Sequence, residues 1–141
     1  MTTTNTQQAI VKEFSGIKDW WGKYGRLIEL GRTLPVLTQS ERTDDKLVKG
    51  CQVKTWYSSS VSEGKVFYRI DSLSLIIRGA LTLLLGVLNG RTPQEIKNLD
   101  LFFIEQADLG ELFSPVKANS LWKVINRMQA DAAAYGQENN K

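Results

Sequence analysis

The sequence predicts an α+β protein in which helices pack on a small antiparallel β-sheet, all within a single domain over residues 1–141. Residues 53–58 and 66–70 carry the alternating, β-branched and aromatic pattern of strands. Residues 73–88 are apolar around nearly the whole helical circumference, which is typical of a buried helix. With 141 residues and 42% hydrophobic content, the chain is long enough to bury one core.

Two amphipathic helices are expected ahead of the strands. Residues 1–5 are expected to be a frayed end, and Thr4 with Gln7 has the spacing of a capping box. Asp19 is the expected N-cap of the second helix, which should end near Gly31. The apolar stripes consist of Ile10, Phe14 and Ile17 in the first helix, and of Trp20, Tyr24, Leu27 and Ile28 in the second.

The middle of the chain is expected to form two or three antiparallel strands. Apolar and polar residues alternate over residues 53–58, and the segment 62–65 (Ser-Glu-Gly-Lys) is typical of a hairpin turn. The return strand over residues 66–70 is rich in β-branched and aromatic side chains. This arrangement places Cys51 at or beside the end of a strand.

The buried helix follows directly. Asp71-Ser72 is the expected N-cap of the helix over residues 73–88, and Asn89-Gly90 is its expected stop. Because this helix has almost no polar face, we expect it to pack across the sheet.

Shorter helices are expected over the rest of the chain. Residues 92–95 combine a threonine cap, a proline at the first helical position and a glutamate three residues after the cap. A further helical segment is expected over residues 99–106, and Ser114-Pro115 should open the last helix or its lead-in. From Gly136 the sequence is polar, and residues 137–141 are expected to fray.

The overall composition excludes several classes of protein. The net charge is only +3 and the basic residues are scattered, so no nucleic-acid partner is expected. The first residues lack the pattern of a signal peptide, and the most apolar segment is shorter than the roughly 20 residues that span a bilayer. One cysteine cannot form an internal disulfide, so we expect a protein of a reducing compartment, the cytoplasm, with no membrane association.

The most informative stretch contains the only cysteine of a chain that has no histidine. Gly50 precedes Cys51 and permits a backbone bend, and Lys49 and Lys54 flank the pair. A lone cysteine is most often a small buried hydrophobic residue. The neighbouring glycine and lysines argue against this interpretation, since the two lysine charges would favour the thiolate over the thiol.

Elimination leaves little chemistry for this thiol. A cysteine or serine hydrolase requires a base that is usually histidine, and a zinc site or iron–sulfur cluster requires several Cys or His ligands. Phosphate-binding and dinucleotide-binding motifs are absent, and the adjacent acids Asp44-Asp45 are typical of a solvated loop. A single thiolate can still accept a sulfur atom as a persulfide and pass it on.

The sequence resembles the SufE family, the sulfur acceptors of cysteine desulfurases in iron–sulfur cluster assembly. The resemblance extends from about Ile10 to Met128. It depends on an ordered set of motifs: Asp19-Trp20, Tyr24, Leu27-Ile28, Leu34-Pro35, Val48-x-Gly50-Cys51-Gln52, Trp56, Asp71-Ser72, Gly90-x-Thr92-Pro93 and Ser114-Pro115-x-x-x-Asn119.

The resemblance implies a role for specific residues. Cys51 would accept the sulfur on a loop beside a hydrophobic cavity, and Gly50, Gln52, Lys117 and Asn119 would contact the partner. Lys117 stands where the family usually has an arginine, and lysine lacks the planar hydrogen-bonding fork of arginine. The fold would be similar to that of SufE and of IscU-type scaffolds.

The resemblance also implies the partners. The sulfur would come from a SufS-type cysteine desulfurase and go to a SufB-type scaffold or another acceptor. The chain would not itself be an enzyme and would hold no cofactor, since the pyridoxal phosphate belongs to the desulfurase. Two alternatives remain open: a CsdE-like relay to another acceptor, and a binding module that regulates a desulfurase while its cysteine is inert.

Overall fold

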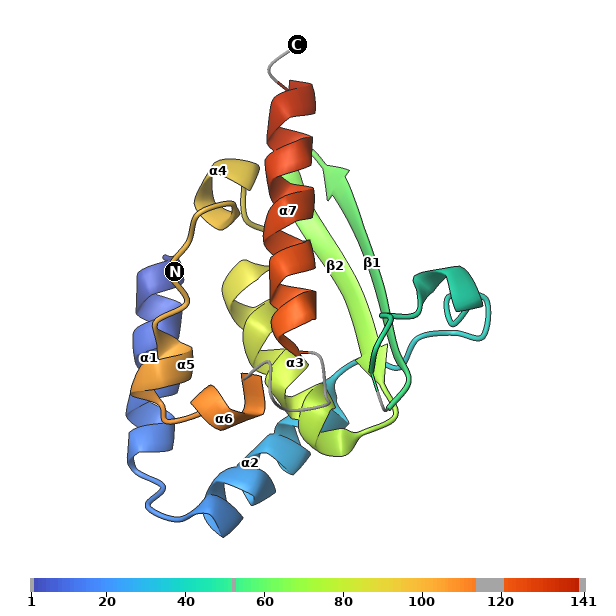
Figure 1. The fold of residues 1–141 in the computed structure, drawn as a ribbon. Helices are drawn as coiled ribbons and strands as arrows, with labels where there is room; N and C mark the ends of the chain where they lie inside the picture. The colour runs from blue at the N-terminus through green and yellow to red at the C-terminus, as the bar shows by residue number, and fades with distance from the viewer. Residues whose placement is uncertain (1, 52, 114–120, 140–141) are drawn as a thin grey trace.

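The computed structural model describes residues 2–51, 53–113 and 121–139. It confirms the α+β class: helices cover one face of a two-stranded antiparallel sheet (Figure 1). The elements in chain order are α1 (Thr3–Ser15), α2 (Trp20–Thr33), the 3₁₀ turn η1 (Asp44–Lys46), β1 (Thr55–Ser62), β2 (Lys65–Ser72), α3 (Leu75–Leu88), α4 (Pro93–Ile96), α5 (Phe103–Gln106), α6 (Gly110–Phe113) and α7 (Leu121–Asn139).

The two strands form a hairpin around the turn that the sequence predicts. Glu63 and Gly64 both have positive φ, of 52° and 76°, which matches the twist of a tight hairpin turn. The register pairs Tyr57 with Ile70. Strand β1 begins at Thr55 and extends through the serines to Ser62, because the tight turn aligns every residue of β1 with a partner on β2.

Helix α3 lies against β2 and is buried as predicted, but its start differs from the prediction. The N-cap is Ser74, whose hydroxyl accepts a hydrogen bond from the backbone N–H of Ile77 at 3.3 Å. Asp71 and Ser72 belong to β2 instead, and Asp71 is fully buried there. Asp71 is therefore not a helix cap, because its carboxylate accepts from Leu37, Arg42 and Ser72, whereas the N–H of Ile77 in the first turn of α3 donates to Ser74.

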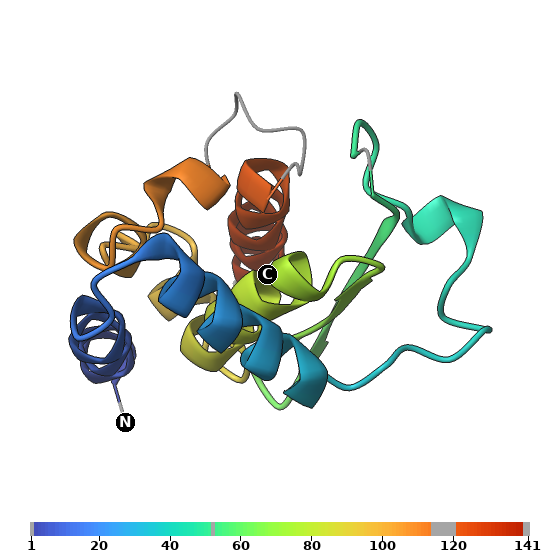
Figure 2. The same cartoon turned by 90° about the horizontal axis from the view of Figure 1, so that it is seen from below.

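Helices α2 and α3 cross at close range, as the view from below shows (Figure 2). Two glycines permit the approach. A Cβ atom on Gly79 would collide with the backbone of Leu27, and one on Gly31 would collide with the carbonyl of Leu75. The close packing ties the second helix to the core formed by α3.

Within the described residues, the first and last helices extend further toward the two ends of the chain than the sequence indicates. Thr2, not Thr4, caps α1 by accepting a hydrogen bond from the N–H of Asn5, so residues 3–5 are helical rather than frayed. Helix α7 continues through Gly136 to Asn139, and Gly136 packs close to Pro93 of α4. Residues 137–139 are therefore helical, because a glycine costs only about 1 kcal/mol in a helix that is packed elsewhere.

Other predicted boundaries hold. The Asp19 carboxylate caps α2 by accepting from the N–H of Gly22 at 2.6 Å, and Thr92 with Glu95 forms the predicted capping box of α4. Of the segment predicted to be helical over residues 99–106, only Phe103–Gln106 forms a helix, which is α5. Ser114-Pro115 lies outside the described residues.

Candidate functional site

Cys51 lies on a short loop between Leu47, which pairs with Trp56, and the start of β1 at Thr55. The loop is at the end of the sheet opposite the hairpin turn. The backbone N–H of Val48 donates to the carbonyl of Thr55 at 2.8 Å, and Leu47 pairs with Trp56 in an isolated antiparallel bridge. On the opposite side, the N–H of Leu73 donates to the carbonyl of Lys54 at 3.1 Å. These contacts hold both ends of the loop, and Cys51 between them is partly exposed.

Gly50 gives the loop its bend, as the sequence predicts. Its φ is +86°, in the region that glycine adopts readily and other residues resist. The space beside it is also filled. A Cβ atom on Gly50 would lie 2.5 Å from Nζ of Lys123, a residue in the first turn of α7.

Lys123 braces the loop from the far end of the chain. Its Nζ donates a hydrogen bond to the carbonyl of Lys49 at 3.3 Å. The last helix therefore contacts the backbone directly before Gly50 and Cys51. No sequence pattern links Lys123 to the cysteine, because the two residues belong to different elements and meet only in the folded chain.

The base of the loop rests on a buried charged cluster. Asp71 is fully buried and pairs in register with Trp56. Its carboxylate accepts from Nη2 of Arg42 at 2.7 Å, from the N–H of Leu37 at 3.2 Å, and from Nη1 of Arg78.

The two arginines have different second roles. The Arg42 guanidinium lies over the Trp56 ring, 4.8 Å from its centre, which is a cation–π contact. Arg78 donates from Nε to the carbonyl of Gly31 at 2.9 Å, and so joins β2 to the end of α2. Burial by itself would raise the pKa of Asp71, but the hydrogen bonds from Arg42, Leu37 and Ser72 and the charge of Arg78 outweigh it and lower that pKa.

Beside the thiol lies a hollow of about 560 Å³. The resemblance implies a hydrophobic cavity here, but the described lining is mixed, because η1 places two carboxylates against the loop. The described lining residues are Asp44, Asp45, Leu47, Val48, Lys49, Gly50, Cys51 and Lys54.

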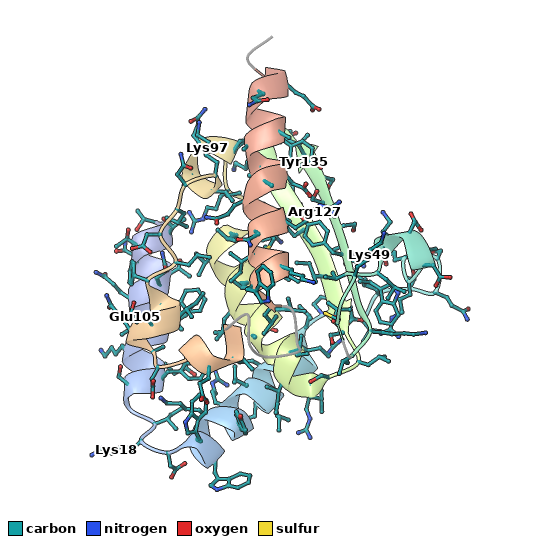
Figure 3. All side chains as sticks on the ribbon, viewed as in Figure 1. Lys18, Lys49, Lys97, Glu105, Arg127 and Tyr135 are labelled. Atoms are coloured by element: carbon teal, nitrogen blue, oxygen red, sulfur yellow. The ribbon has the colours of Figure 1, made fainter. Side chains whose placement is uncertain are left out.

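A second hollow, of about 490 Å³, is lined by residues of the loop and of α7, including Lys49 and Lys123. Tyr57 lies in its wall and donates its hydroxyl to Asp131 of α7 at 2.6 Å. Burial, followed by the hydrogen bond to Asp131, raises the pKa of Tyr57 far above its ordinary value, so the phenol remains a neutral donor. Lys49 and Arg127, labelled in Figure 3, approach this hollow from the loop and from α7.

The structure brings together only part of the predicted site. Gly50 and Cys51 share the loop and line one hollow. Gln52, Lys117 and Asn119 lie outside the described residues, so their predicted role in partner binding stays a prediction. Within the described ranges 2–51, 53–113 and 121–139, no group of three Cys, Asp or Glu side chains is arranged to hold a metal ion.

Sequence analysis missed the residues that hold the cysteine loop and its base in place. Arg78 is the one charged residue in an otherwise apolar helix, and a buried charge needs a buried partner, so this signal pointed to an acid such as Asp71. Lys123 and Arg42 carried no comparable signal, because each is an ordinary polar residue in its own segment.

The fold and the site together define a class: a small α+β protein that presents one cysteine at a glycine bend, with the loop held by a buried ionic cluster and by the last helix. The chain belongs to the SufE family. The family model, described as an Fe-S metabolism associated domain, matches residues 8–132. The chain is therefore linked to iron–sulfur metabolism.

Two relatives illustrate the likeness. The chain is 31% identical over 126 residues to an uncharacterized SufE-like protein of Synechocystis sp., covering 89% of this chain and 79% of the relative. It is similar in fold to the solution structure of a hypothetical protein from Thermus thermophilus, with a TM-score of 0.71, 21% identity, and coverage of 94% of this chain and 96% of that one. None of the helices described is both long and apolar enough to cross a membrane.

Proposed function

We propose that this protein is a sulfur carrier in iron–sulfur metabolism and that Cys51 is the residue that carries the sulfur atom. Its thiolate would attack the outer sulfur of a cysteine persulfide on a SufS-type desulfurase. A sulfur–sulfur bond forms on Cys51, the sulfur–sulfur bond on the donor breaks, and the donor cysteine leaves as a thiolate. No external oxidant or reductant is required.

The observation that carries this proposal is the placement of the chain's one cysteine. Cys51 is partly exposed next to a glycine with φ of +86°, on a loop whose two ends are pinned by backbone hydrogen bonds. An exposed bend on a fixed base suits a residue that must reach into another protein and return. The absence of any histidine in the sequence is consistent with a transfer in which the partner supplies the activation.

The same proposal covers the other roles expected from the family. The protein acts as a stoichiometric carrier rather than an enzyme, holds no cofactor of its own, and stimulates the desulfurase by removing its product sulfur. The pyridoxal phosphate is the desulfurase's. The sulfur then passes to a SufB-type scaffold, or to another acceptor in a CsdE-like relay, in a reducing compartment such as the cytoplasm, where the Cys51 thiol is kept reduced and able to accept sulfur.

The test is intact-protein mass spectrometry after incubation with the cysteine desulfurase of the same organism and free cysteine. We expect the wild-type chain to gain one sulfur atom that maps to Cys51, and the Cys51→Ser variant to gain none and to lose the stimulation of the desulfurase. An active desulfurase that leaves Cys51 unmodified would refute the carrier. Full stimulation by Cys51→Ser would instead establish the binding module with an inert cysteine.

A further inference from the structure

The hollow between the cysteine loop and α7 has a marked charge pattern. It is lined by four cationic side chains and by one carboxylate, that of Asp45. The cations come from three separate segments: η1, the loop and α7. They are Lys46, Lys49, Lys123 and Arg127.

Carboxylates offset only part of this positive charge, and one of them is Asp45, which feels the charge of Lys46. Arg127 pairs with Asp131 at 3.3 Å, and Asp131 also accepts from the hydroxyls of Tyr57 and Ser59. Lys123 donates to a backbone carbonyl, which carries no net charge. Among the described residues, no carboxylate lies within salt-bridge distance of the three lysines.

The hollow also continues to the thiol. The residues that line both this hollow and the one that holds Cys51 are Asp45, Leu47, Val48 and Lys49. Anything bound along the cationic hollow is therefore next to the loop that carries the sulfur. The apolar walls contributed by Leu47 and Val124 leave room for the aliphatic stems of acidic side chains between the cations.

We propose that this cationic groove, defined by Lys46, Lys49, Lys123 and Arg127, binds an acidic segment of the desulfurase, one that bears aspartate or glutamate side chains. The inference rests on the proposed function. Carboxylates in the groove would pair with the lysines and align the partner's persulfide with Cys51. Complementary charge of this kind steers association and sets its register.

The groove fits a protein segment better than a nucleic acid. Its cations are interleaved with apolar walls, and the chain's net charge of only +3 provides no extended basic face for a phosphate backbone. Contact with Lys123 would also reach the hydrogen bond that holds the carbonyl of Lys49. The occupant of the groove would thus touch the residue that braces the cysteine loop.

The test measures binding to the desulfurase in a Cys51→Ser background, so that no sulfur is transferred. The groove variant carries Lys46→Glu with Lys49→Glu. The matched control carries Lys18→Glu with Lys97→Glu, the same change in net charge on the opposite side of the molecule from the labelled Lys49 (Figure 3). Thermal melting verifies that both variants fold, and the milder pair Lys46→Gln with Lys49→Gln is measured alongside.

We expect the groove variant to bind at least about tenfold more weakly, mainly through slower association, and the control to bind within about twofold of the parent. The Gln pair should fall between them, and added salt should weaken the parent more than the groove variant.

Equal binding by the groove variant and the control overturns the groove assignment. If Cys51 of the wild-type chain still accepts sulfur in that case, the proposed function stands alone. Failure of the wild-type chain to bind the desulfurase at all overturns both proposals. Unchanged affinity for the desulfurase with loss of self-association would assign the groove to a second copy of the chain, which also overturns the inference.

Discussion

Replacing Asp71 with asparagine is expected to destabilise the protein strongly without touching the cysteine. The substitution keeps the shape of the side chain but removes its negative charge. Arg78, whose side chain is only 9% exposed, then keeps its charge in the interior with no counter-ion. Arg42, whose guanidinium lies between the Asp71 carboxylate and the Trp56 ring, loses the ion pair in which its Nη2 is 2.7 Å from Oδ2 of Asp71.

The size of the effect follows from this burial. Breaking a buried ion pair by removing one partner costs about 3–5 kcal/mol, because the remaining charge stays desolvated. Domains have a total free energy of unfolding of about 5–15 kcal/mol, so the loss is a large fraction of the whole. For a chain of this length, each kcal/mol lowers the melting temperature by about 2–4 °C, which corresponds to a drop of about 6–20 °C.

The assay is urea unfolding at neutral pH, followed by circular dichroism, with the melting temperature as a second measurement. Glu41→Gln is the matched control, since it breaks a carboxylate–arginine pair with Arg69 of similar length, 2.8 Å, on the surface. We expect a far smaller loss for Glu41→Gln, because water and salt replace an exposed partner. A loss for Asp71→Asn no greater than that for the control would refute the argument that this cluster holds the base of the loop.

Three further predictions follow from the packing and the charges. Gly79→Ala should destabilise the protein, because the new Cβ would collide with the backbone of Leu27. Gly86→Ala in the same helix meets nothing within 4 Å and should raise the free energy of unfolding, measured in urea, by about 0.5–1 kcal/mol. Equal effects of the two substitutions would contradict the close helix crossing. Gly50→Ala should lower the free energy of unfolding by about 1–2 kcal/mol, because φ of +86° strains an L-residue. It should also slow sulfur acceptance by Cys51 in the mass-spectrometric assay. An unchanged rate and an unchanged stability would show that the bend does not need glycine. Stability should be constant from neutral pH to about 5 and fall as the pH drops below about 4, because the pKa of the buried Asp71 is lowered in the folded protein. Its contribution is present above the unfolded-state pKa and is lost as the carboxylate protonates, so an acid-unfolding curve that is flat to about pH 2 would contradict this. Glu41, whose pKa is lowered to about 2 by hydrogen bonds from Arg69, should contribute little because water and salt screen this exposed pair.

The site combines a glycine bend with a fixed base. Cys51 occupies a glycine bend, and around it the backbone is held by β1, by β2 and by Lys123 of α7. The backbone on both sides of the bend is therefore fixed. A carrier of the kind proposed would need such a framework, since its reactive atom must reach two partners while the rest of the docking surface keeps its shape.

Much of the fold was predictable from local pattern. The hairpin turn at residues 62–65, the buried helix and the capping box at Thr92 each depend on residues close together in the chain, so sequence spacing alone identifies them. The errors lie at boundaries. Asp71-Ser72 has the composition of a helix cap, but pairing with β1 extends the strand through Ser72, and Ser74 takes the capping role. Local propensity cannot anticipate this, because the deciding partner strand lies elsewhere.

The sequence by itself determined the fold class and the family. It also identified Cys51 as the residue proposed to carry sulfur, because a single cysteine in a chain without histidine leaves few other chemistries. Only the tertiary structure decided what surrounds that residue. The ion pair of Asp71 with Arg42 joins residues 29 positions apart, and the hydrogen bond from Lys123 to Lys49 joins residues 74 positions apart. Contacts at such separations arise from how whole helices pack on the sheet, and no short segment of the sequence encodes them.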